Sequence, residues 1–558
     1  MKMESSFKVT LDAREPETHR IQVRIEAING KLPEVLAFPV WTPGSYLVRE
    51  FSRHITSFVG GKKILKNEWK LEAGKKAVEY EVYCFERTVR TSYLDSRVLS
   101  LNGANLLPIL GGQLEVNLLL PRAWKTFASA LKHKQKSPGN YWLYAKNDDE
   151  WIDSPIVAAA PEFGGQFQFR SKGKSHRVTW IGTTPAKTKK DLEADIKKIS
   201  DTTQSMFGGA PFISYDYLFD FLPRGYGGLE HRSSQLSHFD GAELADPKRY
   251  QQFLGLVAHE YFHAWNVKSI RPEALGPFNY FQENYTEELW FAEGLTSYFD
   301  DKIVYDAGLL SQRDYEALRI SQMNLVREGT PGIGRRSLAE SSFDAWIRYY
   351  RPDEDTPNSS VSYYEKGSQL GWCWDAHLQK KSRGRWNLTK LLRAIWKEFG
   401  IDAQENLREA KPGYSQDELL DFSARVTGVE HHSVRDWIHA RSPLPWRMAA
   451  SHFKLKVHRK IVSPTAQFLG FIPADREGKA VAANVFSKSA AEESGIAPND
   501  EIIALNDERI INAAGVESFL RRLTGSRVNA LLARSGKIFS VDLQIRPHAD
   551  LGIDYELT

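Results

Sequence analysis

The chain has 558 residues, 42% of them hydrophobic, which is enough for several cores and, as a soft prior, for roughly three or four domains. Its 74 basic and 70 acidic residues leave a net charge of +4, too small to attract nucleic acid or a membrane surface. The two cysteines are too few for a disulfide framework, and no run of about 18 apolar residues predicts a membrane span. Because the amino terminus has no apolar signal core, we expect a soluble, cytoplasmic protein with no nucleic-acid partner and no membrane insertion.

The first 172 residues have the pattern of a β domain. Apolar and polar residues alternate at 20–25 and again at 78–83, and Gly, Pro and Asn punctuate the sequence between such runs. This pattern is typical of a β-sandwich. The segment WTPGSY at 41–46 favours a rigid turn over a direct substrate contact.

A charged helix is predicted next, at 187–206. Its basic residues are interleaved with Asp191, Glu193 and Asp195, which indicates a solvated helix face rather than a site for polyanions. An aromatic strand, predicted at 212–219, leads from this helix to a glycine-rich segment.

The glycine-rich segment reads GGLEH at 227–231. Gly227 and Gly228 have no side chains, so they let the backbone of a ligand approach closely. Glu230 supplies a negative charge that can pair with an ammonium group. The alternative interpretation is an ordinary turn that carries a surface glutamate.

The strongest motif is HEYFH at 259–263, inside an apolar-rich run at 253–265. A helix repeats after about 3.6 residues, so His259 and His263 stand one turn apart and can direct their rings at one metal ion. Glu260 would then reach a water on that metal rather than the metal itself, which is the layout of zinc hydrolysis. Two histidines on a packed helix need polar partners, and one metal ion satisfies both.

A catalytic zinc takes three protein ligands and leaves a fourth position for water. Glu293 is the candidate third ligand, because its carboxylate lies inside a largely apolar helical pattern at 288–299 and would be costly to bury without a cation. Glu287 and Glu288 are competing candidates, and Glu287 could instead orient a ligand histidine. Both residues also fit a solvated helix start.

Two adjacent phenols, Tyr363 and Tyr364, lie further along the chain. Tyr364 could donate its hydroxyl proton to a developing oxyanion, with Tyr363 as the alternative phenol, and either could be a core aromatic. Amphipathic helices are predicted after them at 370–379, 388–399 and 416–426.

Four of these motifs together resemble the gluzincin aminopeptidases. They are the GGLEH segment, HEYFHAW at 259–265, WFAEG at 290–294 and YEKG at 364–367. The segment VWTPGSY at 40–46 is similar to a motif of one gluzincin family, the glycyl aminopeptidases, metallopeptidase family sixty-one. Near the carboxyl end, FLGF at 468–471 and SAAEESGI at 489–496 resemble a PDZ domain, whose groove would have a helix at 515–523 as its other wall.

The resemblance implies a multidomain α+β chain. A β-sandwich-like domain at 1–172 would precede a thermolysin-like, mostly helical catalytic domain at 173–450 and a PDZ domain at 451–558. The implied activity is removal of amino-terminal Gly or Ala from peptides with a free amino terminus. The PDZ domain would capture a carboxyl-terminal peptide ligand through loop amides near Leu469, Gly470 and Phe471, or serve only as a spacer or dimer contact.

The resemblance also implies roles in catalysis. One zinc ion would be held by His259, His263 and Glu293, with Glu260 as general base, Tyr364 at the oxyanion, and Glu230, Gly227 and Gly228 at the ammonium group of the substrate. Two other functions stay open. One is a zinc endopeptidase that recruits substrates through its PDZ domain, and the other is a peptide-binding scaffold with a vestigial zinc site.

Overall fold

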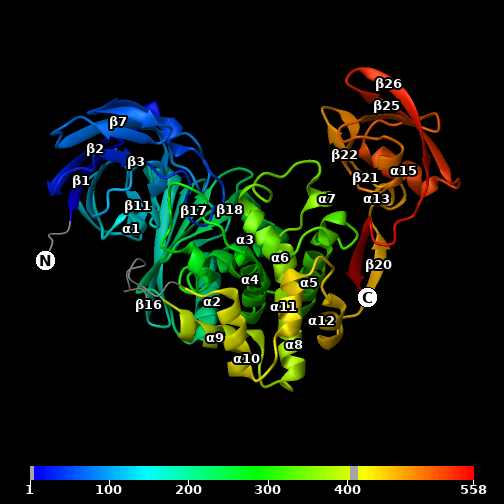
Figure 1. Cartoon of the computed structure of the whole chain (residues 1–558). Helices are drawn as coiled ribbons and strands as arrows, with labels where there is room; N and C mark the ends of the chain where they lie inside the picture. Colours follow the sequence, from blue (N-terminus) through cyan, green and yellow to red (C-terminus); the bar gives the residue numbers. More distant parts are fainter. Residues whose placement is uncertain (1–4, 402–412) are drawn as a thin grey trace. The chain divides into compact units, whose positions relative to one another are not determined.

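The computed structural model describes residues 5–401 and 413–558 (Figure 1). Residues 1–4, part of the segment behind the expectation of no signal core, lie outside the described residues. The chain divides into two compact units, which do not follow the predicted boundaries at 172 and 450; those boundaries stay a prediction. The first unit holds the described residues of Met1–Tyr285, Phe299–Leu310 and Leu392–Leu419, and the second those of Thr286–Tyr298, Ser311–Leu391 and Leu420–Thr558.

Two sheets with a common core form the amino-terminal part of the first unit. The seven-stranded sheet has the order β12 (Lys132–Ser137), β13 (Asn140–Ala145), β10 (Gln113–Leu119), β1 (Ser6–Asp12), β2 (Arg20–Asn29), β7 (Ala77–Tyr83), β4 (Ile55–Val59). The four-stranded sheet has the order β11 (Thr126–Ser129), β14 (Ile156–Ala159), β9 (Val98–Leu101), β8 (Tyr93–Leu94). Alternate residues of β2, such as Val23, pack in one cluster with Leu99 of the other sheet. The β-rich amino-terminal domain and both of its predicted strands are confirmed.

Smaller elements complete this part. A three-stranded sheet runs β3 (Val35–Ala37), β6 (Glu68–Leu71), β5 (Gly61–Leu65). Helix α1 (Asp148–Ile152) follows β13 and is capped by the side chain of Asn147, which accepts a hydrogen bond from the Glu150 amide.

A mixed sheet carries the glycine-rich segment. Its order is β15 (Gly164–Ser171), β16 (Lys174–Gly182), β17 (Ser214–Phe221), β19 (Ser234–Phe239), β18 (Tyr226–Glu230), so β18 is an edge strand. Helix α2 (Lys189–Phe207) packs on β15, and helix α3 (Pro247–Phe262) packs on β18 and β19. The predicted charged helix is confirmed as α2, and the predicted aromatic strand is β17, which begins two residues later than expected.

Helices dominate the chain after α3. They are α4 (Leu295–Asp306), α5 (Gln312–Leu325), α6 (Leu338–Phe343), α7 (Thr356–Ser359), α8 (Glu365–Lys381), α9 (Leu388–Phe399), α10 (Gln416–Thr427), α11 (His432–His439) and α12 (Trp446–His452). Within the second unit α8 packs against α5, α11 and α12, and its residues from Lys366 to Leu378 are buried. Helices are present at all three predicted ranges, as α8, α9 and α10, but α8 is buried along most of its length and is not amphipathic as predicted. No helix in the part of the chain that the structure describes is long and apolar enough to cross a membrane.

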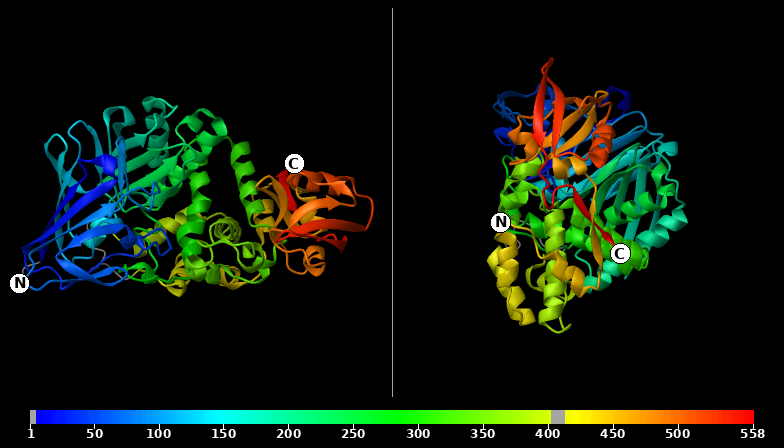
Figure 2. Two further views of the ribbon diagram at one scale, coloured as in Figure 1. Left: turned by 90° about the horizontal axis from the view of Figure 1, so that it is seen from above. Right: turned by 90° about the vertical axis from the view of Figure 1, so that its right-hand side faces the viewer.

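The carboxyl-terminal part of the second unit has its own sheet and core. The strand order is β21 (Phe471–Arg476), β22 (Lys479–Val485), β23 (Glu501–Leu505), β25 (Arg527–Arg534), β26 (Lys537–Gln544), and β24 (Glu508–Arg509) pairs with β23. Helices α13 (Pro464–Phe468), α14 (Ala490–Glu493) and α15 (Ala513–Arg522) belong to this part, and residues of α15 share the core of the sheet. Strand β27 (Ile553–Leu557) returns beside β20 (Val457–Ile461), as the right-hand view of Figure 2 shows in red and orange.

The loop predicted to capture a carboxylate has its amides engaged within the chain. The Leu469 and Gly470 amides both donate to the Thr465 carbonyl, at 2.9 and 3.0 Å, because the short helix α13 ends there. Phe471 begins strand β21 and pairs with Val485. A ligand carboxylate would have to replace these hydrogen bonds, and the PDZ assignment stays a prediction.

Candidate active site

Helix α3 sets the spacing of the two motif histidines. Asp246 caps its start by accepting hydrogen bonds from the Lys248 and Arg249 amides, and Pro247 occupies the first helical position. His259 lies in the last turn and His263 caps the end, so their rings lie with centroids 4.8 Å apart. The spacing of the motif therefore brings the two rings close together.

Each histidine ring is oriented by a contact at its Nδ1 atom, the nitrogen that is not left for a metal. Nδ1 of His263 lies 2.6 Å from the Asn266 carbonyl oxygen, and since a carbonyl only accepts, Nδ1 carries the proton and Nε2 is the nitrogen left for a metal. Nδ1 of His259 lies 3.1 Å from Oδ2 of Asp300 in α4. Glu287 was a candidate for this orienting role, but the carboxylate that contacts His259 is that of Asp300.

Glu293 lies in a single π-helical turn, Trp290–Gly294, that runs directly into α4. The turn is completely buried. Its glycine is required by packing, because a Cβ on Gly294 would lie 2.5 Å from the Cα of Gly367 in α8. The WFAEG and YEKG motifs therefore touch through their glycines, which brings Glu293 near Tyr364.

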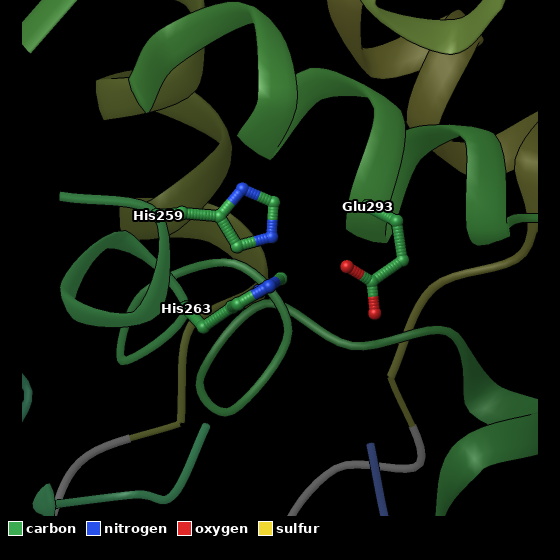
Figure 3. Close-up of side chains that lie close together, drawn as sticks. All are labelled: His259, His263 and Glu293. Atoms are coloured by element: carbon green, nitrogen blue, oxygen red, sulfur yellow. The ribbon is translucent and has the colours of Figure 1, made fainter. Parts of the chain in front are cut away.

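The ligand atoms of His259, His263 and Glu293 all lie within 4.8 Å of one another (Figure 3). Two imidazole nitrogens and one carboxylate oxygen form a donor set that zinc uses in catalytic sites with an open fourth position. A buried carboxylate beside one buried ring and one half-buried ring is costly unless a cation joins them, so the residues fit a zinc ion. Glu287 is exposed and Glu288 half-buried, and neither belongs to a metal-binding group found among the described residues.

A second cluster shares His263 with the first. One side-chain donor atom from each of Glu230, Glu260 and His263 lies within 4.8 Å of the other two, and all three residues are buried. Strand β18 passes directly against the Glu260 carboxylate, because a Cβ on Gly228 would lie 2.0 Å from Glu260 Oε1. Gly227 has φ +133°, a value that favours glycine, and a Cβ there would meet open space. The edge strand therefore carries Glu230 to the side of Glu260.

Glu230 lies near charged residues, but none of those in the described part of the chain forms an ion pair with it. The residue is 4% exposed. The chain just beyond it is fixed by Asp153, which accepts hydrogen bonds from the Arg232 amide at 2.8 Å and from Lys268 Nζ at 2.9 Å. Burial alone would raise the pKa of Asp153, but the Lys268 ammonium and the His231 ring hold that pKa below its usual range. A buried carboxylate without a cationic partner is a place for a ligand cation.

Tyr364 precedes helix α8 and is half-buried, whereas Tyr363 is completely buried. Burial and then the Glu293 carboxylate raise the pKa of Tyr364 well above its usual value. Its phenol therefore stays protonated at neutral pH and can act as a hydrogen-bond donor. Of the two candidate phenols, Tyr364 has the access that a ligand contact needs.

The WTPGSY turn was expected to be structural, and it is a tight turn with a bridge between Thr42 and Ser45. It also lies against the site. A Cβ on Gly44 would lie 2.5 and 2.6 Å from the two carboxylate oxygens of Glu230. The sequence carried no local signal for this contact.

Asp300→Asn should weaken metal binding, because the neutral amide no longer raises the basicity of His259. Loss of such an orienting carboxylate costs about 10- to 100-fold in metal affinity. Competition with a chromogenic chelator measures the change. Asp301→Asn, on the same helix but one residue along, is the matched control, and equal affinities for all three proteins would contradict the orienting role.

Comparisons with known proteins agree with the expected family. A model of the M61 glycyl aminopeptidases matches residues 252–370, and a model of the peptidase M61 amino-terminal domain matches residues 8–160. The first match contains both histidines, Glu293 and Tyr364, and the second contains Gly44. The resemblance to this family is thereby confirmed for these two segments. No curated protein matches the chain.

Solved structures show how far the fold extends. The crystal structure of an aminopeptidase N family protein from Idiomarina loihiensis is 28% identical in sequence, with a TM-score of 0.89 over 99% of this chain and 98% of that one. An M1 zinc metallopeptidase from Deinococcus radiodurans is 12% identical, with a TM-score of 0.48 over 80% of this chain and 96% of that one, too low a score to carry an argument. Together with the family matches, the first structure supports a multidomain aminopeptidase of the metallopeptidase type.

Proposed function

We propose that this chain, whose segments match the M61 glycyl aminopeptidases, is a zinc-dependent aminopeptidase that hydrolyses peptides with a free amino terminus. The observation that carries the proposal is the sharing of His263 by two clusters. One cluster, with His259 and Glu293, has the donor set of a zinc site, and the other holds a buried glutamate beside the catalytic one. This arrangement suits a substrate whose ammonium group lies one residue from the bond that is cut.

One zinc ion would be held by His259, His263 and Glu293. When bound, zinc polarises the scissile carbonyl and lowers the pKa of a coordinated water toward about 7. Glu260 acts as general base: its carboxylate takes a proton from the attacking water and passes it to the departing amine. Tyr364 donates its hydroxyl proton in a hydrogen bond to the oxyanion.

Glu230 is the anchor for the substrate ammonium in this proposal. Its carboxylate is buried and negatively charged, so a substrate cation restores the charge balance that burial otherwise makes costly. Gly227 and Gly228 let the substrate backbone lie along the edge strand β18. An amino-acetylated peptide offers no cation to Glu230 and is expected to be a poor substrate.

The preference for Gly or Ala as first residue is supported by the size of the neighbouring pocket. The pocket that Glu230 lines has a volume of about 30 Å³. A site for one water needs about 10–15 Å³ by the same measure, so the pocket has room for only a few atoms and suits hydrogen or methyl better than a longer side chain.

The carboxyl-terminal domain is proposed to be a PDZ domain, with boundaries near residue 451 as predicted. In its sheet β21 is an edge strand beside α15, which is the arrangement that accepts an added peptide strand. This feature keeps the zinc endopeptidase as the second candidate, because such a domain could recruit proteins by their carboxyl ends.

The deciding experiment compares Gly- and Ala-anilides with their amino-acetylated forms on protein of measured zinc content. Cleavage of the free-amino compounds alone, lost on chelation and restored by zinc, is the expected result. Cleavage of blocked peptides at a similar rate would favour the endopeptidase. Zinc-loaded protein that cleaves neither kind would contradict both enzymes.

A further inference from the structure

The turn at residues 41–46 is fixed firmly beside Glu230. The indole Nε1 of Trp41 donates to the Asn279 carbonyl at 2.8 Å, and the Val40 amide donates to the Tyr280 carbonyl at 2.9 Å. The Trp41 ring is completely buried and packs edge-on against Phe278, with centroids 5.6 Å apart. A turn tied to the chain after α3 at several points keeps its position when a ligand binds.

This turn forms one wall of the pocket that contains Glu230. Trp41, Pro43, Gly44 and Tyr46 come from the turn, and Phe278 and Tyr280 come from the segment that holds it. Large aromatic side chains therefore line this side of the small pocket described above, and charged residues such as Asp153 and Arg271 line the rest together with Glu230. Gly44 has φ +85°, and its lack of a side chain is what lets the turn touch the Glu230 carboxylate.

The chemistry of an aminopeptidase substrate decides which group enters this pocket. The α-carbon of the first residue carries the ammonium group, the scissile carbonyl and the side chain. The carbonyl must face the cluster of His259, His263 and Glu293, and the ammonium must face Glu230. The side chain then needs a space next to the ammonium group, and the pocket lined by Trp41 is next to that group because Glu230 lines it too.

We propose that Trp41 limits the size of the first substrate residue, so that the amino-terminal β domain takes part in setting the preference for hydrogen or methyl. The proposal rests on the function proposed above. In this proposal Trp41 closes the pocket, and Gly44 lets the turn lie against the carboxylate of Glu230. A smaller residue at position 41 would open room for longer apolar side chains next to the same anchor.

The test measures kcat/KM for Gly-, Ala- and Leu-anilides with the full-length zinc-loaded protein and its Trp41→Ala variant. The ratio of kcat/KM for Leu to that for Gly should rise at least about tenfold, since each extra methylene that gains a pocket is worth about 10- to 200-fold. Trp69→Ala is the matched control, because Trp69 is also a buried tryptophan of the β domain but does not line the pocket. Its ratio should stay at the wild-type value although it loses thermal stability.

Trp41→Phe keeps the proposal testable if the alanine variant does not fold. Phenylalanine preserves an aromatic wall but is smaller, so a folded Trp41→Phe protein should show a smaller rise of the same ratio. An unchanged ratio in a folded Trp41 variant, with Gly-anilide still cleaved, would overturn the role of Trp41 and leave the aminopeptidase intact. A wild-type protein that does not distinguish free from acetylated substrates would instead contradict the proposed function itself.

Discussion

Glu260→Gln is expected to bind zinc like the wild type while kcat falls by about 10²- to 10⁴-fold, the range that general base catalysis contributes. The amide has nearly the shape of the carboxylate but cannot take a proton. The Glu260 side chain lies against Gly228 and near Glu230, so a change of shape would disturb the edge strand, whereas glutamine keeps the packing. Turnover of Gly-anilide and zinc content, measured on one preparation, give the two quantities.

Glu287→Gln is the matched control for this variant. Glu287 is an exposed glutamate that belongs to neither cluster, so its kcat and zinc content should both equal those of the wild type. Zinc-loaded Glu260→Gln protein with wild-type turnover would remove Glu260 as the base. Loss of zinc together with turnover would show that Glu260 supports the metal site rather than the proton transfer.

The parts of this site that could be predicted depend on local repeats in the sequence. His259 and His263 are one helical turn apart, so a helix at that position brings their rings together whatever the rest of the fold. Glu293 was found because a carboxylate in an apolar helix requires an explanation. The strands and helices that were predicted could be found for the same reason, since their periods are visible within about ten residues.

The parts that could not be predicted depend on contacts between distant segments. Asp300 meets His259 only because α4 packs beside α3, and nothing near either residue marks the pair. Gly44 reaches Glu230 from the amino-terminal domain, and its motif was interpreted as a structural turn. The FLGF loop shows the opposite case. Its amides were predicted to bind a ligand carboxylate, but two of them donate to the Thr465 carbonyl of the short helix that precedes the loop.

Glu230→Gln is expected to weaken cleavage of free-amino substrates selectively. Glutamine fills the same space beside Gly44 but carries no charge, so a bound ammonium loses its partner in a buried site. Removal of one partner of a buried, hydrogen-bonded charge pair costs about 2–5 kcal/mol, which corresponds to roughly 30- to 4,000-fold in kcat/KM. Amino-acetylated substrates never use that charge, so their slow cleavage should be unchanged or slightly faster.

The comparison of the two substrate types makes this prediction specific to the anchor. A variant with a damaged fold or a displaced metal would lose activity on both types equally. Zinc content should stay at the wild-type level, because Glu230 lies outside the cluster of His259, His263 and Glu293. Equal losses on free and acetylated peptides with zinc retained would refute the anchor and, with it, the reason to place the first side chain beside Trp41. A selective loss would instead fix the position of the amino terminus, and the pocket closed by Trp41 would be the space left for that side chain.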